Sequence, residues 1–83
     1  MTTSTSTSSL REQLRIARLE MADALRDLGI ATARLDAARS QRIPTRAYCV
    51  DATFAADDAR RLARQVATLE AQLSQHVDLS VAA

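Results

Sequence analysis

The side chains that could do chemistry in this sequence are few. His76 is the only histidine and Cys49 the only cysteine among 83 residues. One chain therefore cannot build a metal site from several histidines, and a histidine-based nucleophile set is not expected. We expect His76 to be a packing or capping residue near a helix end. We expect Cys49 to be a small, half-buried apolar residue, and a disulfide between two copies is the alternative.

The acidic residues occur in pairs that do not suit acid–base catalysis. Asp57 and Asp58 are adjacent, so on a helix they point to different faces. Asp23 and Asp27 share a helical face, but their polar surroundings do not provide the buried environment that such catalysis uses. With one glycine, the chain also has no glycine-rich phosphate loop. We therefore expect no enzyme, and neither a cofactor nor a metal ion.

The clearest basic cluster is made of Arg60, Arg61 and Arg64, and we call it the arginine cluster. It could contact phosphate or an acidic partner, or it could be a solvated face paired with the aspartates three residues earlier. We favour the solvated face, because the cluster has no aromatic residues for base stacking and the net charge is only +1. Weak nucleic-acid binding through this face stays an alternative function, and we do not expect it.

The stretch from Leu10 to Arg42 must position the rest of the chain. Its apolar residues recur at alternating spacings of four and three residues, which is typical of a helix packed along its length on another helix. One position of this seam is mostly large, and the other is mostly alanine. The large set is Leu14, Met21, Leu28, Leu35 and Arg42, and the small set is Leu10, Ala17, Ala24, Ala31 and Ala38.

The pattern predicts one all-α domain. Residues 1–8 are a Ser/Thr-rich arm that we expect to be disordered, or to dock on a neighbouring subunit. The first helix covers 9–42, and Ser9 and Glu12 have the spacing of a capping box. It should end there because Pro44 disfavours a helical conformation at the residue before it.

A second helix is predicted after a connector. The connector covers 43–52, and Tyr48 and Val50 should fold back onto the hairpin end. The second helix covers 53–77, with Asp51 or Thr53 as its cap. Residues 78–83 should be a frayed tail. The seam of this helix is Ala55, Ala59, Leu62, Val66, Leu69, Leu73 and His76.

The two helices should form an antiparallel, coiled-coil-like hairpin with an alanine-rich seam. Leu28 should then lie near Leu69, and Leu35 near Leu62. The first helix is longer than the second, so its first turns should overhang. We expect oligomerisation to complete the fold, because a chain this short buries little apolar surface alone. The predicted partner interface is Leu10, Leu14, Ile16, Leu19 and Ile30.

The layout resembles the small helical-hairpin co-chaperones of type III secretion needle subunits. The matching pieces are LREQLRIARLEMADAL, a short turn containing proline and tyrosine, and LARQVATLEAQL. The turn lacks the glycine expected in that family. The resemblance implies a hairpin that holds an aggregation-prone helical subunit in a hydrophobic groove.

The sequence as a whole favours a non-enzymatic protein–protein interaction module. Its partner is expected to be a second copy of itself, a helical protein, or both. Size and composition fit a bacterial or phage accessory, structural or inhibitory protein. No segment approaches the roughly 18 apolar residues of a membrane span, and no secretory signal is recognisable. We therefore expect no membrane partner and a cytoplasmic location, or a virion-associated one if a phage encodes the chain.

Overall fold

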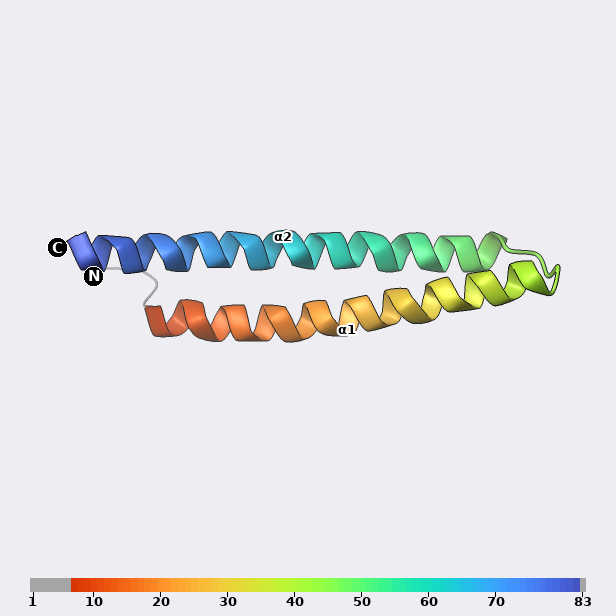
Figure 1. The fold of residues 1–83 in the computed structure, drawn as a ribbon, viewed down its shortest axis with the longest axis horizontal. Coiled ribbons are helices and arrows are strands. Elements are labelled where there is room, and N and C mark those ends of the chain that lie inside the picture. The colour runs from red at the N-terminus through yellow and green to blue at the C-terminus, as the bar shows by residue number, and fades with distance from the viewer. Residues whose placement is uncertain (1–6, 83) are drawn as a thin grey trace.

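The protein is a two-helix antiparallel hairpin (Figure 1). The computed structural model describes residues 7–82, and the side chains of residues 7–76. Helix α1 spans Thr7–Ser40 and helix α2 spans Arg46–Ala82, and the two lie side by side along their length. The all-α hairpin predicted from the heptads is confirmed. The Ser/Thr-rich arm falls mostly outside the described residues, apart from its last two residues, which are helical.

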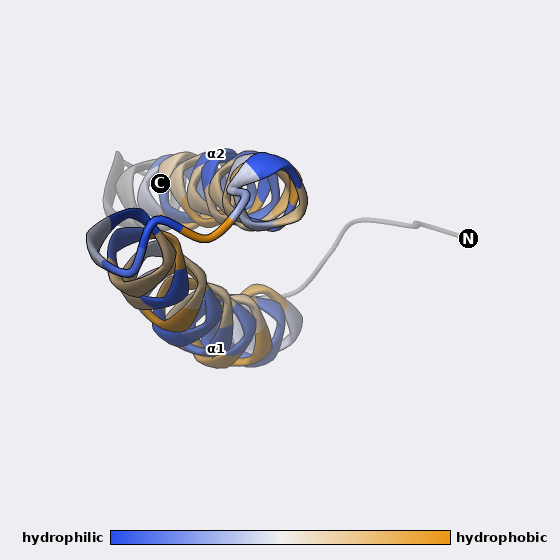
Figure 2. Cartoon of the chain, turned by 90° about the vertical axis from the view of Figure 1, so that its right-hand side faces the viewer, coloured by the Kyte–Doolittle hydropathy of each residue, from blue (hydrophilic) through white to orange (hydrophobic). Residues whose placement is uncertain are grey.

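Local ion pairs support both helices on their solvent sides. Five aspartate or glutamate side chains pair with an arginine three residues later, at N–O distances from 2.5 to 3.9 Å. This order suits a helix, and each exposed pair contributes about 0.2–0.5 kcal/mol. Figure 2 shows that each helix carries both hydrophilic and hydrophobic residues. The helices are therefore amphipathic, and packing between them supplies the main stabilisation.

Helix α1 ends in a Schellman motif. The backbone N–H of Ile43 donates to the carbonyl of Ala38 at 2.9 Å, and that of Arg42 donates to the carbonyl of Arg39 at 3.2 Å. Arg42 has a φ of 58°, the left-handed conformation that usually belongs to glycine at this position. Arg42 therefore lies in the turn and is not the last residue of the seam.

The strained backbone of Arg42 gives the first prediction. Replacing Arg42 with glycine should raise the free energy of unfolding by about 1 kcal/mol, because an L side chain is disfavoured in the left-handed region. Urea unfolding followed by circular dichroism measures the change. Arg42→Val serves as the opposite control and should destabilise the chain. An unchanged or lower stability of Arg42→Gly would contradict the assignment of the turn.

The connector is shorter than the sequence suggested. It covers residues 41–45, and α2 begins at Arg46 instead of near residue 53. Thr45 occupies the N-cap position, since its carbonyl accepts the first helical hydrogen bond, from the N–H of Cys49 at 2.8 Å. Thr53, one of the two expected caps, lies inside the helix, where its hydroxyl donates to the carbonyl of Cys49 at 2.9 Å.

The longer α2 removes the predicted overhang. It reaches Ala82, through the segment expected to be a frayed tail, so it runs beside the first turns of α1. Leu10 and Leu14 are 2% and 4% exposed and belong to the hairpin core. Their assignment to a partner interface is therefore wrong, because α2 already covers them. Ser9 lies inside α1 and not at the N-cap position that the capping box gave it, and Glu12 pairs with Arg15.

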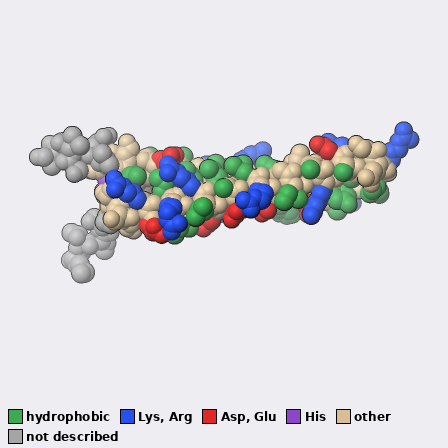
Figure 3. All heavy atoms as spheres, turned by 60° about the horizontal axis from the view of Figure 1, so that its bottom comes forward, with side chains coloured by type: hydrophobic (Ala, Val, Ile, Leu, Met, Phe, Trp, Pro, Cys, Tyr) green, Lys and Arg blue, Asp and Glu red, His purple; other side chains and the backbone are tan. Residues whose placement is uncertain are grey.

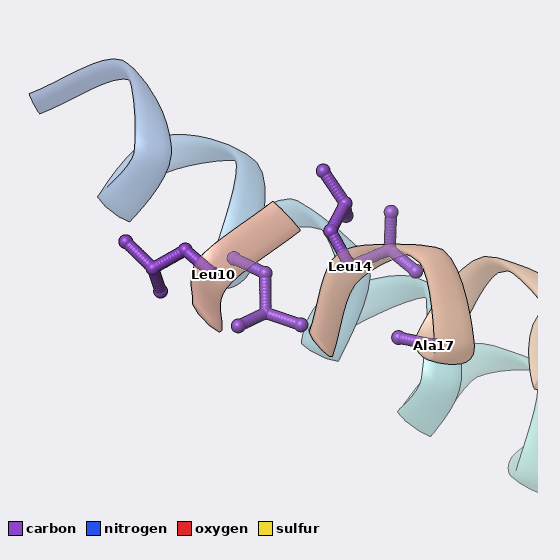
Figure 4. Close-up of a cluster of buried hydrophobic side chains, with 5 residues drawn as sticks. Leu10, Leu14 and Ala17 are labelled. Carbon is purple, nitrogen blue, oxygen red and sulfur yellow. The ribbon is translucent and has the colours of Figure 1, made fainter. Parts of the chain in front are cut away.

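The core consists of two clusters along the seam. The first joins Leu10, Leu14 and Ala17 of α1 (Figure 4) to Val66 and Leu69 of α2. The second joins Ala24 to Ala59 and Leu62. The expected pairing of Leu28 with Leu69 is thus wrong, because Leu69 packs beside Leu14 and Ala17, nearer the start of α1. The facing pairs are shifted because the turn comes earlier in the sequence than predicted: it covers residues 41–45 and not 43–52.

Neither described helix is both long enough and apolar enough to cross a membrane.

Candidate functional site

Several large hydrophobic side chains remain exposed after the helices have packed. On α1 these are Ile16, Leu19, Leu25 and Ile30, with 43%, 57%, 51% and 45% of their surface exposed. Ile43, Val50 and Phe54 form a second group near the turn, and Phe54 is 70% exposed. Figure 3 shows hydrophobic side chains in small groups between charged ones along one side of the molecule. Single exposed apolar residues are normal on a protein surface, whereas contiguous ones mark sites that bind another protein, so the arrangement of these residues on the helix decides their meaning.

The apolar residues on the outer side of α1 form a second heptad pattern. Ile16, Asp23 and Ile30 are spaced by seven residues, and so are Leu19, Arg26 and Ala33. All six are exposed, and their helical positions lie opposite the seam that contacts α2. We call these six residues the outer seam. Three of the five residues predicted for a partner interface, Ile16, Leu19 and Ile30, belong to it.

An ion pair divides the outer seam into two apolar halves. Arg26 Nη1 lies 3.7 Å from Asp23 Oδ1, and both side chains are more than 70% exposed. Ile16 and Leu19 lie before this pair, and Ile30 and Ala33 follow it. The outer seam therefore has an apolar–charged–apolar order that reads alike from both ends.

Leu19 and Ile30 also border shallow hollows between the helices. Leu19 and Leu73 line one hollow, together with Leu14 and the arginines at positions 11, 15 and 18. Ile30 and Tyr48 line another, with Asp27, Arg34 and Asp51. Tyr48 is half-buried there, whereas Val50, which we expected to fold back, is 46% exposed. The outer seam thus borders two hollows at the flanks of the hairpin, and the lining of each mixes apolar and charged residues.

The exposed apolar group near the turn was not predicted from the sequence. Val50 and Phe54 lie four residues apart and therefore on one face of α2. Val50 also lines a hollow with Pro44 and Ala47. The spacing could have revealed this face, but only if α2 had been predicted to begin before Val50.

The arginine cluster is largely neutralised by its neighbours. Arg60 Nη1 lies 3.2 Å from Asp57, and Arg61 Nη2 lies 2.5 Å from Asp58. Within the described side chains, Arg64 has no carboxylate within 4.0 Å. The pairing that the spacing predicted is confirmed, and it lowers the net charge that this face presents.

One ion pair links the two helices among the described residues. Arg18 Nη2 lies 3.0 Å from Glu70 Oε2. Both side chains are more than half exposed, so solvent screens the pair and its contribution to stability is about 0–1 kcal/mol. The pair fits the register of the hairpin, and it contributes little to the stability of the fold.

The ion pair between Glu12 and Arg15 changes the ionisation of Glu12. Arg15 donates two hydrogen bonds to the Glu12 carboxylate, at 2.6 and 3.1 Å, and these bonds together with its charge lower the pKa of Glu12. The favourable pairing is present above the pKa that Glu12 has in the unfolded chain, and it is lost as the pH falls through the lowered pKa. Replacing Arg15 with glutamine should therefore raise the pKa of Glu12 toward its ordinary value.

Carbon-detected NMR titration of the Glu12 carboxyl measures this shift. Arg11→Gln is the matched control, because it removes an arginine one residue from Glu12 and leaves the pair intact. An unchanged pKa of Glu12 in Arg15→Gln would contradict the pairing.

His76 and Cys49 were the remaining candidate residues. His76 and Cys49 are both half-buried, and Cys49 is a free thiol. Cys49 borders a hollow with Leu28, Ala52 and Ala56. Within the described part of the chain, no group of three or more His, Cys, Asp or Glu side chains could hold a metal ion. The surface features that stand out are therefore apolar.

No protein-family model, curated protein or solved structure matches this chain.

Proposed function

We propose that this chain is a non-enzymatic helical-hairpin interaction module that binds a helix on the outer seam of α1, and that the helix is α1 of a second copy. The observation that carries this proposal is the exposure of Ile16, Leu19 and Ile30 opposite the seam that α2 covers. Three large apolar residues at helical spacing are what a helix in a groove or seam uses as anchors.

The energetics support association. The hairpin core is small: one cluster holds three leucines, a valine and an alanine, and the other holds one leucine and two alanines. A two-helix unit with so small a core is marginally stable alone. Fully burying one leucine or isoleucine contributes about 1.5–3 kcal/mol. Ile16, Leu19 and Ile30 are already half covered, so each would contribute less than this. In a two-fold dimer, however, each of them contributes twice.

A second copy suits this surface better than an anionic partner does. The outer seam carries one acidic and one basic residue at its centre, so its charge complements another copy of itself. The arginine cluster lies on α2, and Asp57 and Asp58 already pair with two of its members. We therefore do not propose nucleic-acid binding.

Sedimentation equilibrium across the micromolar range tests this proposal at physiological ionic strength. The apparent mass should rise from the 9.0 kDa of one chain toward twice that value as concentration increases. A constant mass of 9.0 kDa up to high micromolar concentration would overturn self-association. A monomeric chain that instead binds a purified helical subunit would overturn the choice of a second copy as the occupant.

A further inference from the structure

We propose that the two copies pair their α1 helices antiparallel, in a single register set by Asp23 and Arg26. This inference rests on the proposed function and specifies how the two chains meet. Asp23 of each copy faces Arg26 of the other at the centre, and Leu19 faces Ile30 of the second copy on either side.

The heptad spacing of the outer seam leads to this register. In an antiparallel pair, the first seam position of one helix faces the second seam position of its partner. Ile16, Asp23 and Ile30 occupy the first position, and Leu19, Arg26 and Ala33 occupy the second. Placing Asp23 opposite Arg26 brings Ile30 opposite Leu19 and Ile16 opposite Ala33. Each layer of the six-residue outer seam then joins two apolar residues or two opposite charges, and Glu12 faces Ala37 only at the two ends.

Other arrangements lack this match. A parallel pair would place Asp23 against Asp23 and Arg26 against Arg26, and facing like charges are destabilising. An antiparallel pair shifted by one heptad would bury Ile30 or Leu19 against a charged residue, which leaves an apolar layer incomplete. Glu20 and Asp27 border the proposed seam on one side, and Glu20 of one copy repels Asp27 of the other. Both side chains are exposed, so salt screens this repulsion.

The central ion pair is well placed to be shared. Asp23 and Arg26 are 3.7 Å apart and more than 70% exposed, so neither side chain is held by the rest of the hairpin. In the dimer, two such pairs meet and form a network of four charges. A charged layer stabilises less than an apolar one, but it fixes orientation and register in helical pairs.

Charge-swapped chains test the register. Asp23→Arg makes the central layer of a dimer wholly basic, and Arg26→Asp makes it wholly acidic. Each variant alone should therefore associate at least about tenfold more weakly than the unmodified chain, which corresponds to about 1.4 kcal/mol.

An equimolar mixture of the two variants should recover the unmodified affinity. The mixed dimer brings the two basic side chains of one chain against the two acidic side chains of the other, so both central contacts again join opposite charges. In a parallel pair, by contrast, the mixed dimer would associate more tightly than the unmodified chain, since opposite charges would replace the like charges that face each other in the unmodified pair.

The matched control reverses an equivalent ion pair on α2. Asp57 and Arg60 have the same three-residue spacing and similar exposure, with 3.2 Å between them. Asp57→Arg and Arg60→Asp should leave the association unchanged. Circular dichroism should show that all four variants keep the helical content of the unmodified chain, because each replaced side chain is exposed.

The outcomes separate the two proposals. An unmodified chain that stays monomeric overturns the proposed function and this register with it. An unmodified dimer whose Asp23→Arg and Arg26→Asp variants associate normally overturns the register alone. Two monomeric variants that fail to associate when mixed also overturn the register, because opposite charges at the central layer would then not be in contact.

Discussion

Replacing Leu62 with alanine should lower the free energy of unfolding by about 2–5 kcal/mol. Leu62 is 3% exposed and packs against Ala24 and Ala59, whose short side chains cannot fill the space that the leucine would leave. Because a small hairpin has only a few kcal/mol of stability to lose, the variant should be largely unfolded at room temperature. Urea unfolding followed by circular dichroism, at one fixed chain concentration, measures the effect.

Leu25→Ala is the matched control for this substitution. Leu25 is 51% exposed on α1, so the same change in side-chain size should alter stability by only about 0.5 kcal/mol. Equal losses for Leu62→Ala and Leu25→Ala would contradict the assignment of the core.

Replacing Ile30 with aspartate should weaken self-association by about a hundredfold or more. In the proposed dimer, Ile30 faces Leu19 of the second copy, and the two-fold symmetry repeats this contact. Each aspartate would remove an apolar contact and place a carboxylate against a leucine, and a loss of about 1.4 kcal/mol at each of the two contacts gives this factor. Sedimentation equilibrium measures the change in affinity.

Phe54→Asp is the control for surface hydrophobicity in general. Among the described side chains, Phe54 is the most exposed large hydrophobic residue, and it lies on α2, outside the outer seam. Its replacement should leave the mass distribution unchanged. If Phe54→Asp dissociated the dimer and Ile30→Asp did not, the interface would lie at the turn end of the molecule instead of on α1.

The hairpin core could be predicted from the sequence because its period is regular. The buried residues of α1 are Leu10, Leu14, Ala17, Ala24, Leu35 and Ala38, and all of them were seam positions. On the described part of α2, residues 46–76, the buried residues are Ala59, Leu62, Val66 and Leu69, and all four were predicted as seam. A heptad pattern indicates which side of a helix is covered, and it can be recognised from the residues of that helix alone.

The register and the length of α2 could not be predicted in the same way. Between Arg46 and Ala52 the seam continues only through Tyr48 and Ala52, and Pro44 lies just before this stretch, so the hydrophobic pattern was too short to reveal a helix there. The turn was therefore placed too far along the chain, and every facing pair shifted with it. Leu10 and Leu14 were assigned to a partner for the same reason, since their cover comes from α2.

The outer seam was only partly visible in the sequence. Ile16, Leu19 and Ile30 stood out as apolar residues off the first seam, but the charges of Asp23 and Arg26 obscured the second heptad. Asp23 and Arg26 belong to an exposed seam only because α2 covers the opposite side of α1, and that is a property of the folded hairpin.

Disulfide formation between two differently substituted chains tests the antiparallel pairing of the α1 helices directly. One chain carries Leu19→Cys and the other carries Ile30→Cys, both with Cys49→Ser to remove the native thiol. In the proposed register, positions 19 and 30 of different chains face each other. Two copies of position 19 would be about 16 Å apart at 1.5 Å per residue, which is too far for a disulfide.

A mixture of the two chains, equilibrated in a glutathione buffer, should form the mixed disulfide and little of either symmetric one. Mass spectrometry of the covalent dimers gives the proportions. No covalent dimer at a concentration where the chain is dimeric would contradict the outer seam as the interface. Symmetric disulfides in excess of the mixed one would contradict the antiparallel pairing.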